Sequence, residues 1–249
     1  MDIGTFLLMQ SPSFRSSEEV YARAIEQAQA AESLGFRNTW LGEHHFSTYG
    51  YLSRPLQLAS YIAAKTTKLR VGTAVIVVPL HHPLLIAEEI AMLDILSNGR
   101  ADIGLGRGYQ RYEFERLGLQ LDTDGAKWNE SLDIILKAFE GKPFSYDGKL
   151  FKIPETSIFP TPVQKPRPPI WVVGQSPYAI EAAAKRGLNV LTGGFGVSVE
   201  RLAEFGKIFN KVVADTKPAH KTLVGVQRAV YVTKDAADAR AGRNRSIFS

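Results

Sequence analysis

Short apolar segments alternate with longer amphipathic segments along most of this chain. The apolar segments are rich in β-branched residues and predict strands. The amphipathic segments, with apolar positions three or four residues apart, predict helices. The first four expected strands begin near residues 3, 38, 69 and 101, which are 35, 31 and 32 residues apart. This repeat predicts βαβ units in a parallel sheet, either a closed barrel or an open doubly wound sheet.

Start and stop signals mark the boundaries of the expected elements. Ser16 with Glu19 three residues later forms a capping box before a helix that stops at Gly35. We expect strands over residues 3–9, 38–41, 69–78, 101–105, 170–173, 189–191 and 222–233, and helices over residues 17–34, 55–65, 83–97, 124–139, 177–186 and 198–214.

Residues 141–168 interrupt this alternation. Asp147 and Gly148 form a strong hairpin-turn signal, and a proline-rich stretch follows at residues 160–169. We interpret residues 141–168 as an excursion from a single domain that covers residues 1–249, and not as a linker between domains.

Composition and charge narrow the function classes. The chain has no cysteine, which excludes disulfides, thiolate metal sites and a cysteine nucleophile, and which fits a cytoplasmic protein. The net charge of +5 comes from scattered basic residues, so nucleic-acid binding is not expected. No apolar run approaches the ~20 residues that span a bilayer, so no membrane segment is expected.

Two histidines follow the second expected strand. Ligands of parallel α/β folds bind at the carboxyl ends of the strands, and His44 and His45 lie just beyond such an end. Neighbouring residues point in roughly opposite directions, so one histidine can face the ligand while the other packs. His44 is therefore a candidate general base, and a pair of hydrogen-bonded structural histidines is the alternative.

A metal site is a weaker interpretation of the same region. Glu43, His44, His45, His81 and His82 supply metal-ligating groups. However, the helical His-x-x-x-His and Glu-x-x-His spacings are missing, and the side chains of adjacent residues cannot easily coordinate the same metal ion. We expect no metal, and we expect His82 to cap or pack the helix that begins with the next residue.

Glycine-rich and cap-like segments follow the fourth and fifth expected strands. Arg107, flanked by glycines, suits a phosphate group, although the dinucleotide fingerprint fails because Tyr109 stands where its third glycine belongs. Ser176 before Pro177 is a typical N-cap, and the N–H groups that follow, including that of Ala179, form an anion site. A tight turn and an ordinary helix cap are the respective alternatives.

Together these segments resemble the bacterial-luciferase-like family of flavin-dependent monooxygenases. The similarity lies in TWLGEHHF at residues 39–46, GTAV at 72–75, HPLLIAEEIAMLD at 82–94, SNGR at 97–100, GLGRG at 104–108 and WVVGQS at 171–176. Each segment alone is weak evidence for the family. The set of segments, in this order, is specific and covers almost the whole chain.

The resemblance implies an α/β fold, a (β/α)8 TIM-type barrel, usually in a homodimer. It implies reduced FMN supplied by a separate flavin reductase, O2 that adds to the flavin C4a position, and a peroxyflavin that oxidises a small organic substrate. A branch of the family uses a deazaflavin and hydride transfer. We keep two alternatives: a deazaflavin- or nicotinamide-linked oxidoreductase on the same barrel, and a non-catalytic flavin-binding protein.

The resemblance also implies roles for individual residues. His44 corresponds to the active-site histidine beside the reactive edge of the flavin. Arg107 with Gly108, together with Ser176, corresponds to the phosphate-binding groups. Ala74 and Val75 match a position where the family often carries a cis peptide bond under the flavin ring.

Three departures from the family pattern accompany these matches. Gly106 stands where light-emitting members carry a cysteine, and Ala179 replaces a hydroxyl that some members use for the phosphate. Only seven strand signals are present, and residues 234–249 after the last one lack a β-branched run. We therefore expect a barrel truncated before strand eight, with two open edges, which is a fragment of a longer protein or needs a partner subunit for stability.

Overall fold

Seven parallel strands form the central sheet. The computed structural model describes residues 1–123, 125–194, 196–218, 220–230, 232–235 and 237. The sheet has the strand order β1-β2-β3-β4-β7-β8-β9. Its members are β1 (Gly4–Leu7), β2 (Asn38–Leu41), β3 (Arg70–Val77), β4 (Ala101–Gly106), β7 (Ile170–Val173), β8 (Asn189–Gly193) and β9 (Val224–Gln227). The strands form a nearly closed barrel, as the family resemblance implies.

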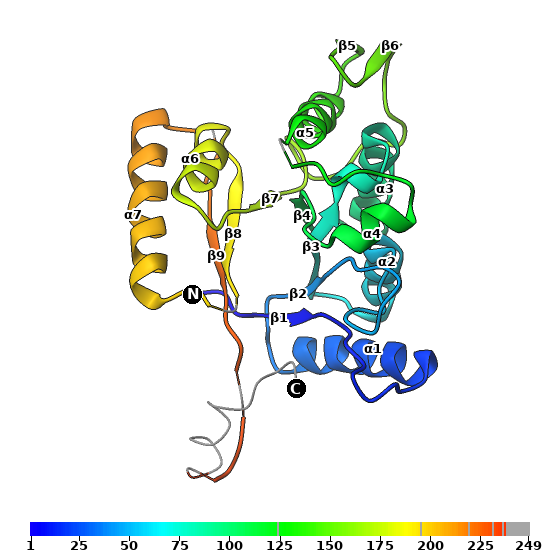
Figure 1. The fold of residues 1–249 in the computed structure, drawn as a ribbon, viewed down its shortest axis with the longest axis vertical. Helices are drawn as coiled ribbons and strands as arrows, with labels where there is room; N and C mark the ends of the chain where they lie inside the picture. Colours follow the sequence, from blue (N-terminus) through cyan, green and yellow to red (C-terminus); the bar gives the residue numbers. More distant parts are fainter. Residues whose placement is uncertain (124, 195, 219, 231, 236, 238–249) are drawn as a thin grey trace.

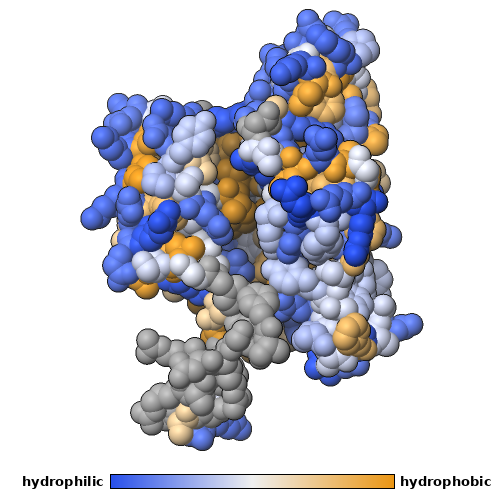
Figure 2. All heavy atoms as spheres, in the orientation of Figure 1, coloured by the Kyte–Doolittle hydropathy of each residue, from blue (hydrophilic) through white to orange (hydrophobic). Residues whose placement is uncertain are grey.

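Helices connect the strands and cover the outside of the sheet. They are α1 (Ser17–Ser33), α2 (Pro55–Lys65), α3 (Pro83–Leu96), α4 (Arg111–Arg116), α5 (Ala126–Ala138), α6 (Pro177–Lys185), α7 (Val199–Thr216) and the short 3-10 helix η1 (Val78–Leu80). In Figure 1, α6 and α7 lie beside β8 and β9, and α1 to α5 lie on the other side of the molecule. Figure 2 shows a hollow with a hydrophobic floor between these two parts.

Helix α1 illustrates how the sequence pattern produces these elements. Ser16 caps it by accepting the N–H of Glu19 at 3.2 Å, which confirms the expected start. Its buried residues recur every three or four positions and face the sheet, and they are Val20, Ala24, Ala28 and Ala31. Small alanines on this face let the helix pack closely against the strands.

The observed elements differ from the expected ones in a few places. The third strand stops at Val77 because Pro79 lies in the 3-10 turn η1. Helix α4 was not predicted, because its six residues are too few to display helical periodicity. The strand expected over residues 222–233 is shorter, and its end includes residue 231, which lies outside the described residues.

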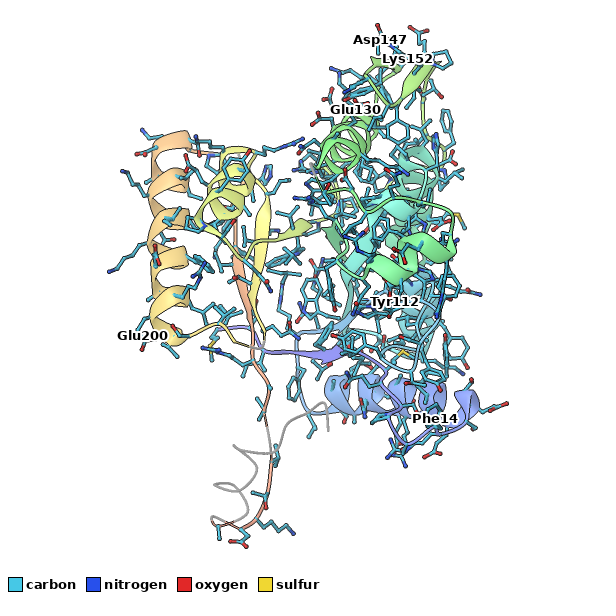
Figure 3. All side chains as sticks on the ribbon, in the orientation of Figure 1. Phe14, Tyr112, Glu130, Asp147, Lys152 and Glu200 are labelled. Carbon is cyan, nitrogen blue, oxygen red and sulfur yellow. The ribbon has the colours of Figure 1, made fainter. Side chains whose placement is uncertain are left out.

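The excursion before β7 contains the predicted hairpin as a separate two-stranded sheet of β5 (Phe144–Asp147) and β6 (Lys152–Thr156). Glu130 of α5 holds its turn, because its carboxylate accepts the N–H groups of Lys149, Leu150 and Phe151 at 2.8–3.1 Å. Figure 3 shows Glu130 below the hairpin residues Asp147 and Lys152.

None of the described helices is both long and apolar enough to cross a membrane.

Candidate active site

The residues expected to form a site follow, or lie in, four neighbouring strands. Strand β2 leads to His44, β3 contains Ala74 and Val75, β4 leads to Arg107, and β7 leads to Ser176. These strands are parallel and adjacent in that order, so their carboxyl ends share one edge. With strands about 4.8 Å apart, the row extends over roughly 14 Å.

His44 is buried and held by a carboxylate from a distant part of the chain. Its Nδ1 lies 3.0 Å from Oε1 of Glu113, which also accepts the backbone N–H of His45 at 2.9 Å. Glu113 is only 1% exposed and lies in α4. Because a carboxylate accepts hydrogen bonds, this contact favours the tautomer with the hydrogen on Nδ1. The other ring nitrogen, Nε2, then has a lone pair with which to accept a proton.

Two tyrosine rings meet His44 edge to face. The ring of Tyr49 lies 4.6 Å from the imidazole and that of Tyr109 lies 5.9 Å away, measured between centroids. The hydroxyl of Tyr109 donates to that of Tyr49 at 3.0 Å. Since Tyr109 is 62% exposed, the pair forms a polar wall between His44 and solvent.

A second buried carboxylate, Glu43, organises the neighbouring histidines. Its Oε1 accepts Nε2–H of His45 at 2.9 Å and of His81 at 2.7 Å, and its Oε2 accepts the N–H of Val77 at 2.7 Å. Arg54 donates to Nδ1 of His81, so Nε2 of His81 carries the hydrogen. Burial acts to raise the pKa of Glu43, but the hydrogen bonds from the two histidines outweigh it and lower the pKa.

His82, another residue considered as a metal ligand, also forms a hydrogen bond within the protein. His82 caps α3, with Nδ1 accepting the N–H of Leu84 at 3.3 Å, as expected. Among the residues that the structure describes, no group of three or more His, Cys, Asp or Glu side chains is arranged to hold a metal ion.

The peptide bond between Ala74 and Val75 is cis, as the resemblance implies. It lies where the pairing of β3 with β4 shifts register. A Cβ at Gly106 would come within 2.4 Å of Cγ2 of Val75, so a side chain at that position does not fit beside this bond. Gly106 thus allows a close approach of two strands at this point.

Arg107 is exposed at the carboxyl edge of the sheet. Its Nη2 donates to the carbonyl oxygens of Asp122 at 2.6 Å and Thr123 at 2.8 Å, and its other N–H groups have no partner among the described residues. Gly108 has a left-handed φ of 77°, and a Cβ there would lie 2.5 Å from Val77, so only glycine fits. The loop thus fixes the guanidinium and leaves donors for an anion.

Ser176 caps α6, as predicted. Its Oγ accepts the N–H of Ala179 at 3.2 Å. The expectation that the Ala179 N–H is free for an anion is therefore wrong, because the cap itself uses that group. The hydroxyl hydrogen of Ser176 and the N–H of Tyr178 remain as donors at this helix start.

Sequence reasoning missed Glu113 and the tyrosine pair. Glu113 is separated from His44 by 69 residues, and in the sequence it stands among the charged residues of a short segment that resembles solvated surface. The buried Phe114 beside it was the one available signal that this segment packs against the barrel.

Comparison with known proteins gives a consistent result for the whole chain. The model of the luciferase-like monooxygenase family matches residues 1–248. This chain belongs to that family.

Named relatives and solved structures extend this result. The oxygenase component of the flavin-dependent trigonelline monooxygenase of Acinetobacter baylyi is 31% identical over 247 residues, which are 98% of this chain and 68% of that protein. The monooxygenase RslO1 from Streptomyces bottropensis superposes with a TM-score of 0.90 at 25% identity, covering 97% of this chain and 75% of RslO1.

A third similar protein is the oxygenating constituent of 3,6-diketocamphane monooxygenase from Pseudomonas putida, solved in complex with FMN. It superposes with a TM-score of 0.79 at 20% identity, and the match covers 90% of this chain and 66% of that protein. At that identity the likeness shows the fold. As a member of the luciferase-like monooxygenases, the chain is an oxidoreductase of a flavin-dependent family, and it spans about two thirds of its trigonelline-oxidising relative.

The residues of the candidate site suit a flavin nucleotide. Arg107 and the start of α6 offer donors for an anionic group at one end of the row. Glycines at positions 104 and 106 let β3 approach β4 closely in the middle of the row, because a Cβ there would lie 2.0 Å from the carbonyl oxygen of Thr73 or 2.4 Å from Cγ2 of Val75. His44 stands at the other end, where its Nδ1 is held by Glu113 and its Nε2 has no hydrogen-bond partner among the residues that the structure describes.

Proposed function

We propose that this luciferase-like monooxygenase uses reduced FMN and O2 to oxidise a small organic substrate. One observation carries the proposal. Four adjacent strands carry or lead to His44, the cis bond at Ala74, Arg107 and Ser176, in that order. Hydrogen-bond donors that suit an anion lie at one end of this row, and the imidazole of His44 lies at the other. When bound, the reduced flavin supplies the electrons that activate O2 for transfer of one oxygen atom.

Arg107 and Ser176 bind the phosphate of the cofactor in this proposal. The guanidinium presents a planar set of donors, and its position is fixed by Asp122 and Thr123 before any ligand arrives. The hydroxyl of Ser176 and the N–H of Tyr178 add donors at the positive end of α6. Both sets are positioned by backbone contacts, so binding costs little side-chain entropy.

His44 moves a proton at Nε2. Glu113 orients the imidazole through Nδ1, and Tyr49 and Tyr109 pack against the ring and restrict its rotation. The tyrosine pair also separates His44 from bulk water on one side. This chain therefore contributes phosphate binding and a positioned acid–base group.

The partners follow from the same proposal. The relative from Acinetobacter baylyi is named an oxygenase component, which supports a separate flavin reductase for this chain. A cytoplasmic location, compatible with the absence of cysteine, would give access to such a reductase.

We also propose a homodimer through α2 and α3. A cavity of about 490 Å³ lies between these helices, and Tyr61, Leu85, Met92 and Leu96 are 49–59% exposed on them. The cavity is lined by Arg54 and Glu89 as well as by apolar groups. A surface that carries both positive and negative side chains can pair with the same surface of a second copy of the chain across a twofold axis.

The proposal is tested by measuring cofactor affinity and oxygen consumption. Titrations with reduced FMN, riboflavin and a reduced deazaflavin are followed by O2 uptake with candidate aldehydes and other small substrates. Charge-assisted hydrogen bonds contribute about 1.5–3 kcal/mol, so Arg107→Ala should weaken FMN binding roughly 10- to 100-fold and leave riboflavin nearly unchanged.

Two results would contradict parts of this proposal. Equal losses for FMN and riboflavin in the Arg107→Ala variant would remove Arg107 from the phosphate site. Tight flavin binding without substrate-dependent O2 uptake would indicate a non-catalytic flavin-binding protein, and preferential binding of the deazaflavin would indicate hydride transfer.

A further inference from the structure

A second polar cavity lies at the opposite end of the sheet from the candidate active site. Its volume is about 290 Å³. Ile170 and Asn189, the first residues of β7 and β8, line it, so it lies at the amino ends of these strands. The proline-rich loop before β7 forms one wall.

The side chains around this cavity are basic. Lys165, Arg167, His220 and Lys221 line it, and none of the described residues that line it is acidic. Lys165 Nζ contacts the carbonyl oxygen of Pro162 at 3.2 Å. The cavity therefore concentrates positive charge without an internal counter-ion.

Arg167 is the main indication that the cavity binds a ligand. Its Nε is buried and has no hydrogen-bond partner among the residues that the structure describes. Burial lowers the pKa of the guanidinium, although arginine stays charged in proteins. A charged donor removed from water without a partner costs free energy, and an oxyanion opposite the guanidinium would restore the lost hydrogen bonds.

The wall that carries Arg167 is held by contacts between Gln164, which lines the cavity, and two residues outside it, Asp94 and Arg70. The side-chain amide of Gln164 donates to Oδ1 of Asp94 at 2.6 Å, and its backbone N–H donates to Oδ2 at 2.8 Å. Its Oε1 accepts a hydrogen bond from Arg70 at 3.2 Å. Across the cavity, Asn189 accepts the N–H of Leu223 at 2.8 Å, which fixes its amide group. The site is therefore formed before a ligand binds.

We propose that this cavity binds a small oxyanion, the phosphate or carboxylate group of a small molecule, through Arg167 and Lys221. Its volume is at the lower end of the roughly 300–1,000 Å³ of ligand pockets, which fits a small anion better than a nucleotide. The site lies apart from the row of residues assigned to the flavin and does not depend on the proposed function.

The test measures binding of inorganic phosphate and of succinate by calorimetry at a fixed salt concentration. Arg167→Gln removes the half-buried charge, Lys221→Gln removes an exposed one, and Lys207→Gln on the exposed side of α7 is the matched control. Arg107→Gln reports on anion binding at the candidate active site. We expect Arg167→Gln to weaken binding at least about tenfold and Lys221→Gln to weaken it less.

The controls should retain this binding. If the wild-type chain binds neither anion, or if Arg167→Gln and Lys221→Gln bind as tightly as Lys207→Gln, the proposal is overturned. Loss of the same binding event in Arg107→Gln would equally overturn it, since the anion would then occupy the other end of the barrel. Because Lys221 is exposed, its variant keeps the test decisive even if Arg167→Gln folds poorly. A response to phosphate alone supports a phosphate-bearing ligand, and a response to succinate alone supports a carboxylate.

Discussion

Replacing Glu113 by glutamine should slow turnover without weakening flavin binding. Glutamine keeps the shape of the side chain, but its amide can present N–H groups where the carboxylate only accepts. Oε1 of Glu113 accepts from both His44 and the His45 backbone, so both buried donors lose their ionic acceptor, and both face N–H groups if the amide turns its nitrogen toward them. The imidazole is then free to reverse its tautomer or turn.

The magnitude follows from the role of His44. General acid–base groups contribute about 10²–10⁴-fold to a rate, and loss of their orientation removes part of that factor. We expect kcat in Glu113→Gln to fall at least about tenfold, with KM for the flavin within a few-fold. Because hydrogen bonds to charged groups contribute about 1.5–3 kcal/mol, the free energy of unfolding should fall by a similar amount.

Steady-state oxygen uptake at saturating reduced flavin measures this effect. Glu115→Gln, an exposed change in the same helix, is the control and should behave like the wild type. In a double-mutant cycle, Glu113→Gln should add little once His44 is alanine, because it acts through that ring. Full additivity of the two changes, or an unchanged kcat in a folded Glu113→Gln variant, would refute the reasoning.

Three further changes test other parts of the structure. Hydrogen bonds hold the pKa of Glu43 in the folded protein below its ordinary value of 4.5. The ionised Glu43 therefore stabilises the folded state fully above pH 4.5, and this contribution is lost as the pH falls through the pKa of the folded protein. Glu43→Gln should therefore lower the free energy of urea unfolding by about 1.5–3 kcal/mol at neutral pH, with a smaller difference in acid; a constant difference would contradict this. Met92→Glu should convert the proposed dimer to a monomer in sedimentation experiments, whereas Leu34→Glu at the end of α1 should not; equal behaviour would argue against the proposed α2–α3 interface. Glu130→Ala should increase amide exchange in the turn between β5 and β6 but not in the barrel, and unchanged exchange in the turn would show that this carboxylate does not hold it.

The alternation of apolar and amphipathic segments was sufficient to predict the parallel sheet. Strand and helix signals are local, because they depend on side chains within a few positions of one another. Ser16, Pro55 and Ser176 mark helix starts in the sequence, and the structure begins helices there. Closure into a barrel came from the family resemblance, since the spacing of units is the same in open sheets. Helix α4 was missed because six residues give no periodic signal.

The residues at the strand ends were also readable from the sequence. His44, Arg107 and Ser176 stand directly after apolar strands, and parallel strands bring their carboxyl ends to one edge. Their assignment to a flavin site remains a prediction.

Only the tertiary structure decided which groups meet. Glu113 reaches His44 from α4, and Glu43 receives hydrogen bonds from both His45 and His81. Arg167 lies in a basic cavity at the far end of the sheet. Such contacts depend on strand order, register and helix placement, which join residues tens of positions apart. A sequence pattern specifies the direction of a side chain within its own element, but the partner of that side chain is set by the packing of the whole barrel.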